Sequence, residues 1–261
     1  MILEGSNSFF YLFVLKYVWI RDDSMKKVAV ITGCAKGIGR EIALELARDG
    51  YDIIGTYNTS ISEINNLKER IECIGVKFSS YKLDLLNEVE INSFCNKLKE
   101  LYNKIDVLIN NAALSLDNNF LDKTSEEFKD ILQVNLISPF LLIQKLNSIM
   151  SNGVIINISS TDGINTYSKL NVDYSASKAA LINLTKSLSL ELENIRIYAI
   201  CPNWVNTESI REMNSEYLKE EMERIGQRNL IEPTEIAKKV IKLIENNLKS
   251  GSIVVMEDKH E

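Results

Sequence analysis

Residues 32–39 read Thr-Gly-Cys-Ala-Lys-Gly-Ile-Gly, directly after an apolar, β-branched run and directly before a helical pattern that starts at Arg40. In a strand, turn, helix context, glycines let the backbone turn tightly, approach a pyrophosphate closely and pack a helix against a strand. The N-terminus of the following helix offers free N–H groups to the anion. This stretch therefore predicts a dinucleotide-binding turn, and a glycine-rich turn that binds no ligand is the alternative.

The rest of the chain alternates short β-branched runs with helical patterns, which is typical of repeated βαβ units. Continuous apolar runs such as residues 154–156 are typical of strands covered on both faces. We expect a single α/β domain, a Rossmann-type doubly wound parallel sheet of about seven strands with helices on both faces. The expected strands are residues 28–32, 52–57, 77–82, 107–110, 154–159, 196–200 and 252–255.

Composition limits the chemistry that the chain can perform. The 261 residues include 30 basic and 36 acidic side chains, and no basic block is long enough to follow a phosphate backbone, so nucleic acid is not an expected partner. The single histidine, His260, lies second from the end. A Ser-His-Asp triad, a Cys-His pair and a histidine-rich zinc site are thereby excluded, and no metal site is expected. Proton chemistry must use Tyr, Lys, Asp, Glu or Cys.

The four cysteines form no Cys-x-x-Cys pair and have no regular spacing. This is typical of small buried hydrophobes in a reducing compartment and predicts a cytoplasmic location. The apolar stretch 9–20 is too short to span a bilayer and has no signal-peptide features, so no membrane association is expected. We expect residues 1–24 to be an extension outside the fold and residues 25–261 to form the catalytic domain.

The residues after the second expected strand favour NADP over NAD. A fold specific for NAD usually places an acid about 20 residues beyond the glycines to hold the ribose 2′-hydroxyl. Here residues 56–60 read Thr-Tyr-Asn-Thr-Ser, which contains no carboxylate to repel a 2′-phosphate. Lys36 in the turn, together with Asn58 and Thr56, can donate to that phosphate. A solvated surface lysine is the alternative for Lys36.

A tyrosine and a lysine are spaced to share one helix face. Tyr174 and Lys178 lie four residues apart at the start of a helical pattern that runs to about residue 193. A phenol has a pKa near 10, and an adjacent ammonium lowers it, so Tyr174 could act as general acid or base. An amphipathic helix with an ordinary surface lysine is the alternative. Ser160 and Asn111 follow expected strand ends, where parallel sheets bind ligands.

From Lys26 to Val255 the chain resembles the short-chain dehydrogenase/reductase family, through several motifs in the family's order. Its Thr-Gly-x-x-x-Gly-x-Gly falls on residues 32–39, its Asp-hydrophobic adenine contact on Asp84-Leu85, and its Asn-Asn-Ala-Gly on residues 110–113. The family's tetrad falls on Asn135, Ser160, Tyr174 and Lys178. The cofactor-binding residues that the resemblance implies are Gly33, Lys36, Gly37, Ile38, Gly39, Asn58, Asp84, Leu85, Asn111, Tyr174, Lys178, Val205 and Thr207.

The resemblance implies a role for each member of the tetrad. NADPH would deliver hydride to a carbonyl carbon while Tyr174 donates a proton to the oxygen. Ser160 would orient that oxygen, and Lys178 would hold the nicotinamide ribose and lower the pKa of Tyr174. Asn135 would anchor a water in the proton relay.

The sequence departs from the family pattern at three places. Ala113 replaces the glycine of the second motif. The family's Pro-Gly-x-x-x-Thr reads Pro-Asn-Trp-Val-Asn-Thr at residues 202–207, so Asn203 must supply the backbone freedom of that glycine. The usual Asp-Gly-Gly ending is replaced at residues 256–261, which puts the C-terminal contacts of family tetramers in doubt. A homodimer through two long helices, or a homotetramer, is still expected.

The central motifs most resemble those of β-ketoacyl-acyl-carrier-protein reductases, so a carbonyl reductase acting on a small molecule or an acyl thioester is the leading interpretation. Oxidation of a sugar alcohol or a steroid-like alcohol, and a non-catalytic NADP-binding sensor, are the alternatives. Substrate choice would depend on residues 115–120 and on a charged, amphipathic segment at about 208–229 that we expect to form a mobile lid.

Overall fold

The computed structural model describes residues 26–246 and 248–258. The expected N-terminal extension, residues 1–24, lies outside the described residues, as does His260. Seven parallel strands form one sheet in the order β3-β2-β1-β4-β5-β6-β7, which confirms the expected fold class. The strands are β1 (Val28–Ile31), β2 (Asp52–Tyr57), β3 (Phe78–Lys82), β4 (Val107–Asn110), β5 (Val154–Ile158), β6 (Arg196–Pro202) and β7 (Ile253–Met256).

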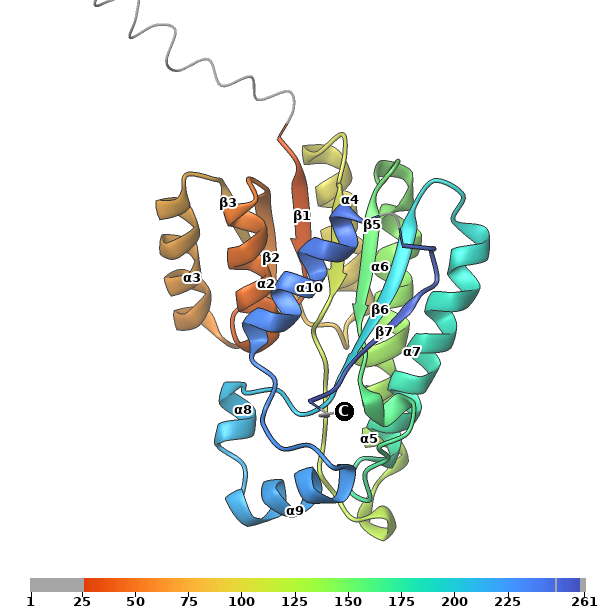
Figure 1. Ribbon diagram of the computed structural model, residues 1–261. Coiled ribbons are helices and arrows are strands. Elements are labelled where there is room, and N and C mark those ends of the chain that lie inside the picture. Colours follow the sequence, from red (N-terminus) through yellow and green to blue (C-terminus); the bar gives the residue numbers. More distant parts are fainter. Residues whose placement is uncertain (1–25, 247, 259–261) are drawn as a thin grey trace, which may run out of the picture.

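Helices cover both faces of the sheet (Figure 1). α2, α3 and α10 pack on one face and α4, α6 and α7 on the other, each group over its own cluster of buried apolar side chains. The helices are α2 (Gly37–Arg48), α3 (Ile61–Ile74), α4 (Glu88–Leu101), α5 (Ser125–Leu132), α6 (Ser138–Leu146), α7 (Val172–Glu191), α8 (Glu208–Arg211), α9 (Ser215–Ile225) and α10 (Pro233–Glu245). A π-helical turn, Gln133–Ile137, joins α5 to α6.

Local sequence signals explain where several helices start and stop. The Asn87 side chain accepts hydrogen bonds from the second and third backbone N–H groups of α4. Thr124 and Glu127 form a reciprocal capping box at the start of α5. α3 ends at Gly75 in the left-handed conformation, with φ of 95°, which glycine adopts without steric penalty.

The strand order reverses between β1 and β4, and this reversal places the ligand site. The chain runs outward from β1 to β2 and β3, and then returns to β4 on the other side of β1. Two neighbouring connections therefore diverge at the carboxyl ends of these strands, where open α/β sheets have their binding crevice. Helices α8 and α9, from the expected lid segment, lie beyond the same ends of the strands (Figure 1).

One glycine of β2 is fixed by packing. A Cβ at Gly55 would collide with Cys34 Sγ, and it would lie 3.1 Å from the ring of Phe78. The Cys34 side chain thus fills the space above Gly55, and burial raises the pKa of its thiol to about 12. Cys34 is a packing residue rather than a reactive thiol.

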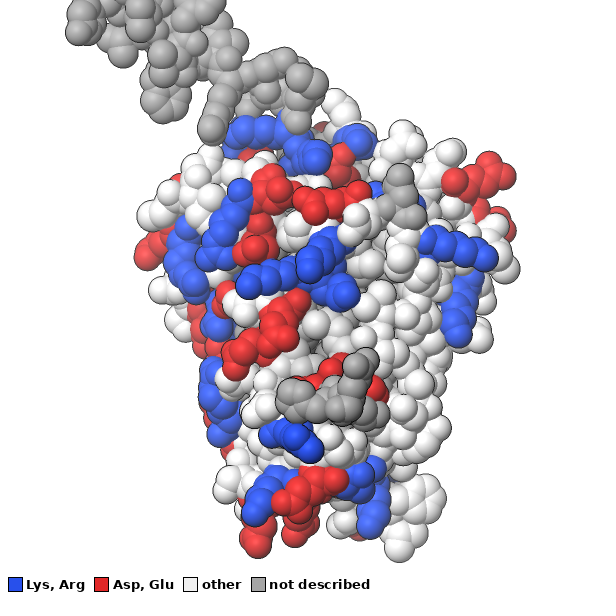
Figure 2. All heavy atoms as spheres, in the orientation of Figure 1, with Lys and Arg blue, Asp and Glu red and all other residues white. Residues whose placement is uncertain are grey.

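The described helices do not have the length and apolarity of membrane spans, and the face drawn in Figure 2 carries charges of both signs. Across residues 26–246 and 248–258, every helix is too short or too polar to cross a bilayer. On the face drawn in Figure 2, Lys and Arg side chains are interleaved with Asp and Glu side chains over α2, α9 and α10. The four cysteines are free, and three of them are buried.

Candidate active site

Tyr174 and Lys178 lie one turn apart on α7, as their spacing predicts. Lys178 is 2% exposed, and its Nζ donates a hydrogen bond to the carbonyl oxygen of Ile158 at 2.8 Å. The same nitrogen lies 5.3 Å from the centroid of the Tyr174 ring. The last residue of β5 therefore holds the amine beneath the phenol, at the carboxyl edge of the sheet.

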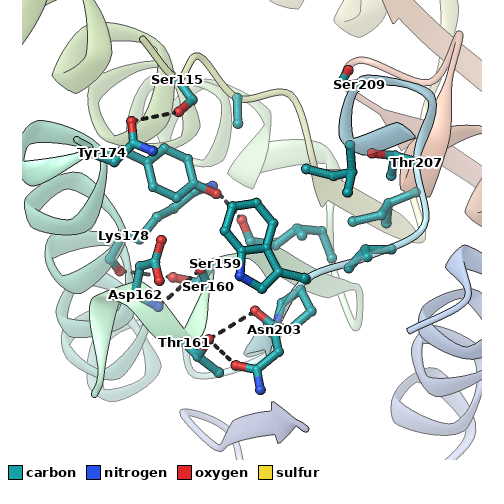
Figure 3. A pocket seen from close by; sticks show the side chains of 18 of the residues that line it. Ser115, Ser159, Ser160, Thr161, Asp162, Tyr174, Lys178, Asn203, Thr207 and Ser209 are labelled. Carbon is teal, nitrogen blue, oxygen red and sulfur yellow. Dashed lines mark hydrogen bonds between the residues drawn. The ribbon is translucent and has the colours of Figure 1, made fainter. Parts of the chain in front are cut away.

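Ser160 follows β5 and faces the same phenol. Its side chain lies close enough to the Tyr174 hydroxyl to lower the pKa of that phenol, and its Oγ accepts the backbone N–H of Asp162 at 3.1 Å. Figure 3 shows Tyr174, Ser160 and Asp162 on one side of a cavity. Tyr174 comes from α7, whereas Ser160 and Asp162 come from the turn after β5. The serine and the phenol that sequence analysis paired are therefore in contact.

The electrostatics of Tyr174 and Lys178 are set mainly by burial. Burial raises the pKa of Tyr174 above its ordinary value, and the nearby charge of Asp162 raises it further. Burial also lowers the pKa of Lys178, to about 8. Desolvation of the phenol is the largest effect on the pKa of Tyr174 in this site, so the lowering of that pKa by Lys178 stays a prediction.

Asn135 supports the site from behind. It lies in the π-helical turn between α5 and α6 and is 1% exposed. Its Oδ1 accepts the backbone N–H of Leu114 at 2.8 Å, and its Nδ2 donates to Leu114 O and to Ser177 Oγ. The side chain thus fixes the segment after β4 against α7. Its expected part in a water relay stays a prediction.

The glycine-rich turn has the geometry that its sequence predicts. Gly33 and Gly37 have φ of 62° and 53°, a region that favours glycine. A Cβ on Gly39 would lie 2.5 Å from both Asn111 Nδ2 and Gly33 O, so only glycine fits there. Asn111 Nδ2 donates to the backbone oxygens of Thr32 and Gly33, which ties the turn to the residues after β4.

The N-terminus of α2 already binds a carboxylate of the chain. The backbone N–H of Gly37 donates to Glu208 Oε2 at 3.1 Å, and Arg40 Nη1 donates to Glu208 Oε1 at 2.6 Å. Thr207, beside Glu208, would contact a Cβ on Gly37. The helix N-terminus therefore faces an anion, as its free N–H groups favour.

Two cavities meet at the carboxyl ends of the strands. The first, of about 480 Å³, is lined by Tyr174 and Lys178, and the second, of about 490 Å³, lies along the glycine-rich turn. Both volumes are typical of small-molecule sites. Residues that line both cavities are Ile38, Asn111, Ala113, Thr207 and Ser209. Predicted cofactor residues that line the second cavity are Gly33, Lys36, Gly37, Ile38, Asn58, Asp84, Leu85, Asn111 and Thr207, and Val205 lines the first.

Lys36 has a partner that the sequence did not suggest. Its Nζ lies 2.8 Å from Glu63 Oε1, on α3, and both side chains are partly exposed. The stretch at residues 56–60 contains no acid, but the fold brings this carboxylate from the next helix to the rim of the second cavity. Asn58 lines that cavity, as predicted.

Asn203 does not adopt the glycine-like backbone conformation that the sequence predicts for it. Among the described residues, the non-glycine positions with positive φ are Asn152 and Tyr167, so Asn203 does not use the backbone freedom of a glycine. Its Oδ1 instead contacts the hydroxyl of Thr161, and the residue is buried beside Trp204 in the first cavity. Side-chain hydrogen bonding at the end of β6 explains the asparagine.

A buried ion pair holds the loop at residues 114–123 against the catalytic helix. Lys123 Nζ lies 2.9 Å from Asp173 Oδ2 and donates to Leu116 O, and both charged side chains are almost completely buried. Asp173 Oδ1 also accepts the backbone N–H of Tyr174. The loop that was expected to influence substrate choice is thereby anchored to Asp173, the residue before Tyr174.

Comparison with known proteins identifies the family. A family model described as short chain dehydrogenase matches residues 27–218. The chain belongs to the short-chain dehydrogenase family. It is 35% identical to the 3-oxoacyl-acyl-carrier-protein reductase FabG of Aquifex aeolicus, over 82% of this chain and 88% of that protein. It is 30% identical to the FabG of Staphylococcus epidermidis, over 86% of this chain and 94% of that protein.

A solved structure supports the same assignment. The angucycline C-6 ketoreductase LanV, crystallised with bound NADP, superposes with a TM-score of 0.80 at 27% identity, covering 88% of this chain and 93% of that one. This short-chain dehydrogenase is therefore an oxidoreductase that interconverts carbonyl and alcohol groups with a nicotinamide dinucleotide. The side chains at the site fit that cofactor, because the glycines leave a cradle that a Cβ would fill.

Four site residues of this short-chain dehydrogenase were not found from the sequence. Glu63 and Glu208 approach the cofactor turn from distant segments, and Trp204 and Asp162 enter the first cavity. Asp162 follows Ser160 by two residues, so its nearness to Ser160 in the sequence was the one signal that could have identified it as a site residue.

In the described residues, no three side chains of the metal-binding types gather into a group that could hold an ion.

The buried amine of Lys178 predicts a pH dependence of stability. Its pKa falls from 10.5 to about 8 on folding, so between these values the unfolded chain binds more protons. The free energy of unfolding should therefore rise with pH in this window, by about 1 kcal/mol per unit relative to a Lys178→Met variant. Denaturant unfolding of both proteins at pH 8 and pH 10 measures the difference, and equal pH dependence in the two would contradict the assignment.

Proposed function

We propose that this protein uses NADPH to reduce a carbonyl group to a secondary alcohol. The observation that carries the proposal is that the Tyr174 phenol and Ser160 line the same cavity wall, with the Lys178 amine 5.3 Å from the phenol ring. A phenol kept protonated by burial is a proton donor for a substrate oxygen. The serine hydroxyl is placed to orient that oxygen.

The reaction balances as one carbonyl, one NADPH and one proton giving one alcohol and one NADP⁺. NADPH supplies the hydride when it is bound. Tyr174 gives its hydroxyl proton to the carbonyl oxygen, and Ser160 donates a hydrogen bond to the same oxygen. Lys178, with a pKa of about 8, can gain or lose a proton near neutral pH and lies close enough to favour the phenolate left behind.

A β-ketoacyl thioester is one substrate that the similar reductases suggest, since both FabG proteins carry that activity in their names. Oxidation of a sugar alcohol or a steroid-like alcohol by the same residues is the second candidate. It is favoured by the polar lining of the first cavity, which includes Ser115, Asp162 and Asn171. We also infer that residues 208–229 form a lid over the site, because Met213 and Ile225 line the first cavity. The free cysteines favour a cytoplasmic location.

Replacing Tyr174 by phenylalanine removes the proposed proton donor with little change in shape. We expect turnover to fall by at least about a hundredfold while NADPH binding is retained, because general acid catalysis contributes on that scale. NADPH oxidation with a panel of ketones and acyl thioesters measures turnover, and fluorescence titration measures binding. Tyr167→Phe is the matched control, since the Tyr167 hydroxyl bonds Ile164 O outside the cavity. Unchanged turnover in Tyr174→Phe would refute the assignment.

NADPH preference is proposed to depend on Lys36 and Asn58, which line the second cavity. Lys36 would exchange the Glu63 carboxylate for the 2′-phosphate. Lys36→Met should therefore raise the KM for NADPH several-fold and leave that for NADH nearly unchanged, as expected for one exposed ion pair. Glu63→Gln should lower the KM for NADPH, because it frees Lys36 and removes a like charge. Equal effects on the two cofactors would contradict this role.

We propose that the protein assembles as a homodimer or a homotetramer. Large apolar side chains stand exposed on the α5 to α6 segment and at the end of α7, where the outer surface of this layer is free of other elements. They include Phe128, Ile137, Phe140 and Leu190. Exposed apolar surface of this kind marks association sites.

Light scattering of the full chain tests the assembly. The unsubstituted protein should have at least twice the mass of one chain, and Phe140→Asp should shift it toward the monomer, because the carboxylate would be desolvated at the interface. Val89→Asp, on α4, changes another exposed apolar residue and should leave the mass unaltered. A monomeric parent protein, or equal dissociation by both substitutions, would overturn this interface.

A further inference from the structure

The carboxylate of Asp162 stands in the first cavity, next to the groups that handle the reacting oxygen. Asp162 lies on the short 3-10 turn Thr161–Gly163, directly after Ser160. Its backbone N–H donates to Ser160 Oγ, and its charge raises the pKa of the Tyr174 phenol. Figure 3 shows the carboxylate beside Ser160 on the same wall of the cavity as Tyr174.

Only one oxygen of this carboxylate has a partner within the described chain. Oδ1 accepts a hydrogen bond from Thr166 Oγ1 at 2.5 Å, and Oδ2 accepts none. Oδ2 does not belong to the buried polar atoms without a partner, so it is open to the cavity. Partial burial raises the pKa of the Asp162 carboxyl, and a partly desolvated carboxylate is stabilised by a donor that reaches it.

The nearest cation does not supply that donor. Arg224 of α9 uses its guanidinium for Glu221, within 2.6 Å, and for the backbone oxygen of Thr166. No ion pair within 4.0 Å joins it to Asp162 in the part of the chain that the structure describes. Lys178, the one cation in the cavity lining, is held by Ile158 O. A substrate hydroxyl bound in the cavity can supply the donor that the described chain does not.

We propose that Asp162 is a specificity residue whose Oδ2 accepts a hydrogen bond from a hydroxyl on the carbon next to the reacting carbon. The preferred substrates are then α-hydroxy ketones in the direction of reduction and vicinal diols in the direction of oxidation. This inference rests on the proposed carbonyl reductase function and names its substrate class. The neighbouring carbon is specified because Ser160, at the reacting oxygen, caps the short turn that carries Asp162 and accepts the Asp162 backbone N–H.

The same geometry disfavours substrates without that hydroxyl. A simple alkyl ketone, or the keto form of a β-ketoacyl thioester, has only carbon and hydrogen on the atoms next to the keto carbon. Either would press an apolar group against a desolvated carboxylate, and a site built to bind a hydroxyl discriminates strongly against an analogue that lacks it. Asp117, the other carboxylate of the cavity lining, makes an anionic substrate still less suitable.

Two ketones of equal size test the proposal. Hydroxyacetone and butan-2-one differ only in a terminal hydroxyl against a methyl group, and NADPH oxidation gives kcat/KM for each with the full chain. We expect hydroxyacetone to be preferred by about tenfold or more, as for a hydrogen bond to a charged group. Asp162→Leu should bring the ratio close to one. Asp162→Asn, which keeps an oxygen acceptor without the charge, should give an intermediate ratio.

Because the ratio is measured within each protein, partial loss of folded enzyme does not change it. Two control variants distinguish a direct contact of Asp162 with the substrate from an effect of the turn or of the other carboxylate. Thr166→Val removes the other hydrogen bond of Asp162, and Asp117→Asn removes the second carboxylate of the cavity. Both should keep the preference for hydroxyacetone. If Thr166→Val abolishes the preference as Asp162→Leu does, Asp162 acts only by holding the turn, and the proposal is overturned.

The remaining outcomes separate this proposal from the proposed function. If both ketones are reduced equally well, or if Asp162→Leu keeps the preference, the specificity role is overturned while the reductase function stands. If no ketone or thioester is reduced with NADPH and propane-1,2-diol is not oxidised with NADP⁺, the proposed function itself fails and takes this inference with it.

Discussion

The site depends on a hydrogen-bonded joint between the turn after β1 and the segment after β4. Thr32 Oγ1 accepts the backbone N–H groups of Asn111 and Ala112, each at 3.0 Å, and the Asn111 amide returns hydrogen bonds to the turn. The joint lies where the strand order reverses, so it fixes the floor shared by the two cavities. It also leaves no room for a side chain at Gly39.

The side chains around the first cavity are held by buried hydrogen bonds and a buried ion pair. Lys178 reaches the end of β5, Asn135 holds Leu114, and the Lys123 to Asp173 pair holds the loop above them. Each of these polar groups is out of water, so electrostatic effects between them are stronger than on a surface. Burial is the first cause of the pKa shifts of Lys178 and Tyr174, which is why Tyr174 favours its protonated form.

The sequence was sufficient for the fold because short apolar, β-branched runs alternate with helical patterns along the chain. Predicted strand ends differ from the observed ones by two residues or fewer, as at β6, which continues to Pro202. The pairing of Tyr174 with Ser160 was also accessible, since both follow motifs in order. Glu63 and Glu208 were not, because an exposed acid on a helix has the same local pattern wherever tertiary packing brings it.

The packing of Cys34 over Gly55 has a consequence for how this family can vary. The sulfur occupies the space that a methyl group on β2 would need, and the Phe78 ring closes the same gap. The two positions thus share one small volume beneath the cofactor turn. In related chains, a larger side chain at one of them is compatible only with a smaller one at the other, so the two sites must evolve as a pair although 21 residues separate them.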